Sequence, residues 1–216
     1  MRFVSRPAFA RSAPFGLFIG LLIVNSVLHL PWLVAVRALV VAAALAWFWR
    51  EYGELRRPTA VRPSHWALAA AAGLAVFLAW IWLDQDWATL SPSPAFDPLH
   101  EDGQMNWPLA LLRLAGLALV VPLMEELFWR SFLLRWLERH DFLSVAPAAV
   151  GMRAFALTTV LFALEHDQWL AGAIAGTVYN ALYLRSGNLW VPILAHTVTN
   201  AALGVWVLST ENWHFW

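Results

Sequence analysis

Four long stretches without a charged residue constrain the fold of this chain more than any other feature of its sequence. They are residues 12–36, 63–83, 168–184 and 186–210. An apolar helix of about 20 residues is long enough to cross about 30 Å of hydrocarbon. Transmembrane β-strands would instead show short segments of alternating polarity, which this sequence lacks. We therefore predict an all-α fold, a polytopic transmembrane helical bundle whose outer surface contacts the lipid bilayer.

The composition excludes several other classes of protein. Hydrophobic residues make up 61% of the chain and charged residues only 13%, whereas a soluble domain contains about 25% charged residues. The 14 basic residues balance the 14 acidic residues and are scattered along the chain, so no nucleic-acid partner is expected. The lack of cysteine excludes disulfides, thiolate metal ligands and a cysteine nucleophile.

Seven spans can be drawn along the chain, and the charges that flank them predict an orientation. The spans lie near residues 14–30, 34–49, 65–83, 107–134, 151–166, 169–184 and 189–208. Arginine is enriched in the cytoplasmic loops of membrane proteins. Because Arg2, Arg6 and Arg11 precede the first span and Arg57 lies in a basic loop, we expect a cytoplasmic N-terminus. The acidic loop that contains Glu101 then faces outward.

Two arginines do not follow this charge pattern. Arg37 and Arg113 lie near span ends on the side opposite the cytoplasm. Long basic side chains can bury their aliphatic part and extend the charged group toward the membrane interface. We therefore expect both side chains to reach the interface.

The unusual polar residues are confined to the second half of the chain. Residues 1–106 comprise the first three spans and the acidic outer loop, and those spans are expected to lack buried ionisable groups. Residues 107–216 place ionisable residues inside expected spans, where each costs about 2.5–3.5 kcal/mol on insertion scales. We therefore divide the chain into an N-terminal part, 1–106, and a catalytic membrane core, 107–216, whose site lies in the C-terminal four helices.

Three ionisable residues, Glu125, His166 and His196, are expected at similar depths in the membrane. Counted from the arginines at the cytoplasmic span ends, they lie roughly 21, 20 and 17 Å deep at about 1.5 Å per residue. Three different helices thus bring polar groups to one level. Such a cluster is what a buried, water-filled reaction site requires.

The segment around Glu125 contains two glutamates that are not equivalent. Glu126 and Arg130 are four residues apart and can pair on one helix face. Glu125 is rotated about 100° away from that face, so it is free to act as a general base. Pro122 removes a backbone hydrogen bond and is expected to kink the helix. The alternative interpretation of Glu126 and Arg130 is an ion pair at a helix end.

His166 and Phe162 also share a helix face, so the aromatic ring can pack beside the imidazole. Histidine accepts and donates protons near neutral pH, although a lone histidine at a span end is more often an interfacial residue. Its neighbours Glu165 and Asp167 are expected to be solvated loop charges.

His196 and Asn200 form a third pair with helical spacing. Both can donate hydrogen bonds to an oxyanion, but such pairs also connect helices in membrane bundles. Gly172 and Gly176 are expected to permit close helix packing. Asn180 is expected to be a buried amide that supports the site.

Taken together, the motifs EExxxR, FxxxH and HxxxN on successive helices resemble the CPBP family, which comprises CAAX prenyl endopeptidases and bacteriocin-processing relatives. The residues that carry the resemblance are Glu125, Glu126, Arg130, Phe162, His166, His196 and Asn200. The stretch from Tyr179 to His196 further resembles a bacterial subgroup linked to exosortase and PEP-CTERM sorting systems.

The resemblance implies a peptidase, namely an intramembrane endopeptidase of the glutamate type, with no cofactor and no metal. It implies that Glu125 and His166 activate a water molecule. It also implies that His196 and Asn200 stabilise the oxyanion, while Glu126 and Arg130 hold the geometry of the site.

The expected substrate is a membrane-embedded or membrane-anchored polypeptide that is cut near its terminus. The expected location is the plasma membrane of a bacterium, and an exosortase-type sorting system is the expected partner.

Three other interpretations fit the same residues. A zinc metalloprotease could use His166, His196 and Glu125 as ligands, although no HExxH motif is present. A non-enzymatic membrane partner in protein sorting is the second alternative. A transporter could use buried Glu and His as a proton relay, but inverted repeats are not apparent.

Overall fold

The computed structural model describes residues 5–56, 61–90, 96–100 and 102–216. Three residues used above to orient the chain, Arg2, Arg57 and Glu101, lie outside these ranges. The described residues form helices and turns, with one isolated β-bridge between Leu99 and Met105 and no strand. The predicted all-α bundle is confirmed.

The long helices follow the expected spans closely. One of them, Trp107–Trp136, is a continuous helix of five parts: α4 (Trp107–Ala115), η5 (Gly116–Val120), α5 (Val121–Glu126), η6 (Leu127–Leu133) and α6 (Leu134–Trp136). The others are α1 (Arg6–Leu28), α2 (Leu33–Trp47), α3 (Pro63–Trp82), α7 (Met152–Leu164), α8 (Trp169–Ser186) and α9 (Trp190–Thr210).

Four of these helices are long and apolar enough to cross a membrane by length and composition: α1, α3, Trp107–Trp136 and α9. The helices α2 and α7 are apolar but shorter. The protein is therefore an integral membrane protein.

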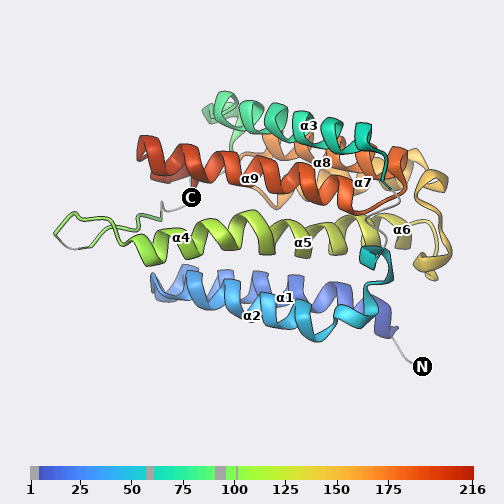
Figure 1. The fold of residues 1–216 in the computed structure, drawn as a ribbon, viewed down its shortest axis with the longest axis horizontal. Coiled ribbons are helices and arrows are strands. Elements are labelled where there is room, and N and C mark those ends of the chain that lie inside the picture. Colours follow the sequence, from blue (N-terminus) through green and yellow to red (C-terminus); the bar gives the residue numbers. More distant parts are fainter. Residues whose placement is uncertain (1–4, 57–60, 91–95, 101) are drawn as a thin grey trace.

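The long helix Trp107–Trp136 lies in the middle of the bundle (Figure 1). The pair α1–α2 packs on one side of it, and α3 and α9 lie on the other side, with α7 and α8 behind them. Close packing between α3 and α9 depends on Gly73, because a Cβ at this position would lie 2.4 Å from the carbonyl oxygen of Ala195. This packing holds α9, which carries His196 and Asn200, in place.

Small residues also bring α7 and α8 together. A Cβ at Gly172 would lie 3.2 Å from the Cα of Ala163, and one at Gly176 would lie 3.3 Å from the ring of Phe162. The predicted role of this GxxxG motif in helix packing is confirmed. The close approach of the two helices packs Phe162 against α8, the helix that carries Asn180.

The two π-helical segments, η5 and η6, lie on either side of Glu125 and Glu126. The helix continues through Pro122, which begins α5 directly after η5. π-Helical turns are rare and occur often at functional sites. They change the rotation of the helix on both sides of the two glutamates.

The N-terminal helices contain buried ionisable groups, so the prediction that they lack them is wrong. Helix α1 begins at Arg6, after Ser5, whose hydroxyl accepts a hydrogen bond from the amide of Ala8. Arg11 therefore lies inside the helix and is buried. Arg37 is also buried. The sequence placed Arg11 before the first span because the uncharged stretch begins one residue later.

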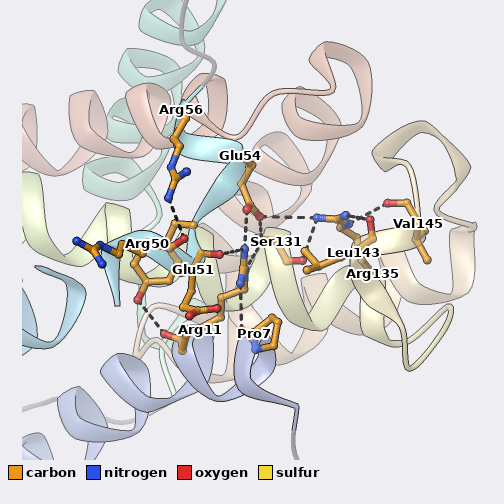
Figure 2. Close-up of polar contacts among 12 residues, drawn as sticks. Pro7, Arg11, Arg50, Glu51, Glu54, Arg56, Ser131, Arg135, Leu143 and Val145 are labelled. Carbon is orange, nitrogen blue, oxygen red and sulfur yellow. Dashed lines mark hydrogen bonds and ion pairs between the residues drawn. The ribbon is translucent and has the colours of Figure 1, made fainter. Parts of the chain in front are cut away.

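Figure 2 shows the polar cluster that surrounds Arg11. Its Nε atom donates to Oγ of Ser131, 2.7 Å away, and its Nη2 atom lies 2.5 Å from Oε2 of Glu54. The hydroxyl of Ser131 donates to Oε1 of Glu54, and Arg135 lies 3.8 Å from the same oxygen. This cluster joins α1, the segment η2 (Gly53–Arg56) and the long helix.

Candidate active site

A cavity of about 220 Å³ lies inside the bundle, and all four predicted catalytic residues line it. Glu125 comes from α5, His166 follows α7, and His196 and Asn200 come from α9. The rest of the wall is mostly apolar and aromatic. It is made by Phe18, Ile19, Leu22, Trp80, Leu117, Val121, Phe162, Glu165, Ala175, Tyr179, Leu203, Gly204, Phe215 and Trp216.

Glu126 and Arg130 form a buried ion pair, as their spacing predicts. The Nη1 atom of Arg130 lies 3.1 Å from Oε1 of Glu126. The Nε atom of Arg130 donates to Oδ1 of Asn180, also at 3.1 Å, and the guanidinium lies 4.4 Å from the ring centroid of Phe162. Arg130 thus connects the long helix to α7 and α8. Asn180 supports the site, as predicted from its burial.

His196 is oriented by Glu126. Its Nδ1 atom lies 3.0 Å from Oε1 of Glu126. A carboxylate paired with Arg130 can only accept, so Nδ1 of His196 carries a hydrogen and donates it. The ring stacks on Tyr179, with the centroids 4.9 Å apart and an interplanar angle of 23°. These contacts direct Nε2 of His196 toward Glu125, whose Oε2 atom is 4.0 Å away.

His166 is oriented by the backbone. Its Nδ1 atom lies 2.8 Å from the carbonyl oxygen of Phe162, which can only accept, so Nδ1 is the donor. The ring packs between Phe162 and Trp80, with centroids 4.7 and 5.2 Å away. In a neutral imidazole the other nitrogen, Nε2, is then unprotonated and available as a base.

Glu125 is buried, and its Oε2 atom has no hydrogen-bond partner within the described part of the chain. The nearest basic atom recorded for it is Nε2 of His196, at 4.0 Å. The two adjacent glutamates therefore differ as the sequence predicts. Arg130 and His196 bind Oε1 of Glu126, while Oε2 of each glutamate has no partner among the described residues. Of the two glutamates, Glu125 is the one that lines the cavity.

Asn200 is held at the cavity wall by η5. Its Nδ2 atom donates to the carbonyl oxygen of Leu117, 2.9 Å away. An amide NH₂ group has two hydrogens, so one remains for a group inside the cavity. The irregular helix before Pro122 thus contributes the carbonyl that orients Asn200.

Glu165 lines the cavity, so its assignment to a solvated loop was wrong. Its Oε2 atom accepts a hydrogen bond from Nε1 of Trp129 at 3.0 Å, and its Oε1 atom is buried without a partner among the described residues. Trp129 belongs to the same long helix as Glu125, four residues further on. Only the fold brings it to Glu165, 36 positions away, so no sequence pattern predicts this contact.

Tyr179 is the other side chain at the site that sequence reasoning missed. Its ring covers His196, and its hydroxyl donates to Oγ1 of Thr199 at 2.7 Å. The spacing of Thr199 and His196 on α9 does not identify this partner, because Tyr179 lies on α8.

In the described residues, no group of three or more His, Asp or Glu side chains is arranged to hold a metal ion.

Comparison with known proteins identifies the family. Residues 107–202 match the family described as type II CAAX prenyl endopeptidase Rce1-like. The match begins at the first residue of α4 and ends just after Asn200, so it includes all three motifs. This match, which covers less than half of the chain, supports the CPBP family for residues 107–202.

The match supports a relation to membrane endopeptidases of the CAAX type, a family that acts on membrane-associated substrates. No significant match was found among curated proteins or among solved structures. The family match does not resolve the exosortase-linked subgroup, which stays a prediction.

Proposed function

We propose that this CPBP protein is a glutamate-type intramembrane endopeptidase that needs no metal ion. The observation that carries the proposal is the arrangement of Glu125, His166, His196 and Asn200 around one cavity. In this arrangement Glu126 is paired with Arg130, whereas the basic group within 4.0 Å of Glu125 in the described chain is the imidazole of His196 rather than an arginine. Two candidate proton acceptors and two candidate hydrogen-bond donors thus face the same space.

In the proposed reaction, a water molecule lies between Glu125 and His166. The carboxylate of Glu125 and Nε2 of His166 are the two available proton acceptors. One of them removes a proton as the water oxygen attacks the carbonyl carbon of the scissile peptide bond. The same group returns the proton to the departing amine, so the protein is unchanged after one turnover.

The negative charge on the carbonyl oxygen is stabilised from α9. Asn200 donates its remaining Nδ2 hydrogen. His196 donates from Nε2 when both of its ring nitrogens carry hydrogens, and Glu126 stabilises that cationic form through Nδ1. This gives Glu126 and Arg130 a positioning role, because neither needs to touch the substrate.

The apolar wall of the cavity and the membrane-spanning helices support a substrate that is itself embedded in or anchored to the membrane. We also propose the orientation predicted from the arginine pattern, with the N-terminus in the cytoplasm of a bacterium. A sorting partner of the exosortase type is part of the same proposal. A neighbouring exosortase gene would support that partner, and its absence from related genomes would remove it.

The experiment that tests the proposal is cleavage of membrane-anchored reporter peptides by purified protein in lipid nanodiscs, with products identified by mass spectrometry. Glu125→Gln should abolish cleavage while the variant still inserts and folds, because it removes the proton acceptor but no ion pair with an arginine. Arg153→Met, which removes an exposed arginine, is the matched control and should cleave normally. Undiminished cleavage by Glu125→Gln would refute the assigned base.

A further inference from the structure

A second, smaller pocket lies between α1, α2 and the long helix, and two buried arginines line it. They are Arg37 of α2 and Arg113 of α4, which are 7% and 8% exposed. The expectation that both extend to the membrane interface is wrong, because the helices turn both side chains into the bundle. Both residues therefore bring a positive charge to the same pocket.

Neither arginine has an acidic partner within the part of the chain that the structure describes. Of the five buried arginines in the described ranges, Arg11, Arg130 and Arg135 each lie within 4.0 Å of a carboxylate oxygen. Arg37 and Arg113 have no such oxygen and no hydrogen bond among those residues, and Nε of Arg113 is buried without a partner.

Aromatic rings are the only recorded contacts of the two guanidinium groups with other side chains in the described chain. That of Arg37 lies 4.6 Å from the ring centroid of Phe18, and that of Arg113 lies 4.4 Å from Phe96 and 5.5 Å from Trp216. Cation–π contacts offset part of the cost of burying a charge. They leave Nε of Arg113 buried without a hydrogen-bond partner in the described chain, and buried charges in proteins are normally paired. The two arginines therefore form a site that is suited to binding an anion.

The chemistry of the pocket favours a carboxylate. A guanidinium presents planar pairs of N–H donors that match the two oxygens of a carboxylate or phosphate. The pocket has a volume of about 20 Å³, which is space for a water-sized group. So small a space disfavours the bulky phosphodiester of a lipid, and a carboxylate is the smaller of the two anions.

The pocket adjoins the catalytic cavity. Phe18, Leu117 and Val121 line both spaces. Along the helix, Arg113 precedes Glu125 by 12 residues, which is at most about 18 Å. An extended peptide covers about 3.3 Å per residue, so a peptide cleaved at Glu125 reaches Arg113 with about five residues or fewer.

We propose that Arg37 and Arg113 bind a carboxylate of the peptide substrate, located within about five residues of the cleaved bond. The carboxylate is either an acidic side chain or the end of the peptide. The inference rests on the proposed endopeptidase function and adds a specificity site to it.

The test uses reporter peptides that differ only in charge. One series carries Glu or Gln at each of the five positions on either side of the cleaved bond, and a second series ends in a free carboxylate or an amide. At one of these positions, wild-type protein should cleave the acidic peptide with a kcat/KM about tenfold or more above that for the neutral peptide. The reason is that charge-assisted hydrogen bonds are strong. The double variant Arg37→Met/Arg113→Met should lose this preference, and Arg153→Met should retain it.

Two results would overturn the inference. One is a wild-type protein with no preference for a carboxylate at any position. The other is a double variant whose kcat/KM falls by the same factor for the acidic and the neutral peptide. That result would indicate a structural role for the two arginines. The double variant should fold, since methionine replaces an unpaired buried charge at each position. The two single variants can be compared with the acidic and the neutral peptide in the same way.

A binding measurement separates this inference from the proposed reaction. The Glu125→Gln variant is titrated with the acidic and the neutral peptide, and the shift in its Tm is recorded. The acidic peptide should raise the Tm more, and only when both arginines are present. If the variant binds in this way but wild-type protein does not cleave, the proposed function fails and the carboxylate site stands. If vesicles of phosphatidylglycerol, but not the peptides, raise the Tm through the arginines, the ligand is a lipid and the inference is wrong.

Discussion

Replacing Arg130 with methionine should destabilise the protein severely. The substitution removes the cation that lies 3.1 Å from Glu126 and the donor to Asn180. Removing one partner of a buried ion pair typically costs about 3–5 kcal/mol, because the remaining charge is left uncompensated. The orphaned amide oxygen of Asn180 adds about 1–3 kcal/mol. We expect a loss of at least about 3 kcal/mol, a large part of the roughly 5–15 kcal/mol by which proteins are stable.

The neighbouring glutamate provides the contrast. Glu125→Gln breaks no ion pair with an arginine, and Oε2 of Glu125 has no hydrogen-bond partner among the residues described. We expect this variant to change the unfolding free energy by less than about 1 kcal/mol. Arg153→Met removes an exposed arginine and controls for loss of a positive charge.

The assay is reversible unfolding in mixed micelles, followed by tryptophan fluorescence, with size-exclusion chromatography to measure the folded fraction. The reasoning would be refuted in either of two cases. In the first, Arg130→Met is as stable as Arg153→Met. In the second, Glu125→Gln and Arg130→Met lose the same unfolding free energy.

Two further predictions follow from the polar contacts. Burial raises the pKa of Glu54, but the charge of Arg11 and the hydrogen bond from Ser131 lower it by more, so the pKa lies below its ordinary value of 4.5. A lowered pKa in the folded state contributes stability that is present above pH 4.5 and lost as the pH falls through the folded-state pKa. Unfolding free energies between pH 3 and 6 should therefore decline more steeply toward acid for wild type than for Glu54→Gln, and parallel curves would contradict the assignment. Asn200→Ala should reduce reporter cleavage by about 10²–10³-fold, the usual effect of losing one oxyanion donor. A rate equal to that of wild type would remove Asn200 from the reaction.

The helices were predictable because the uncharged stretches fix their length and position. The convergence of Glu125, His166 and His196 was also predictable, since the rise per residue converts sequence distance into position along a helix. The structure places all three around one cavity. Their catalytic roles remain predictions that mutagenesis must test.

The residues that sequence analysis misplaced share one physical cause. Depth does not determine which way a helix faces, so Arg37 and Arg113 could point to the interface or into the bundle. Glu165 was assigned to solvent because its partner, Trp129, is brought to it only by the fold. Arg11 was placed outside the first span because Glu54 and Ser131, which stabilise it, are distant in the sequence.

The most direct test of the central claim is to measure the zinc content and peptide cleavage of the same purified protein. If Glu125 is a metal-free general base, the active protein should contain far less than one zinc per chain. Its cleavage rate should be unchanged by a strong chelator, while Glu125→Gln should be inactive. Stoichiometric zinc, with activity lost on chelation and restored by added zinc, would contradict the account.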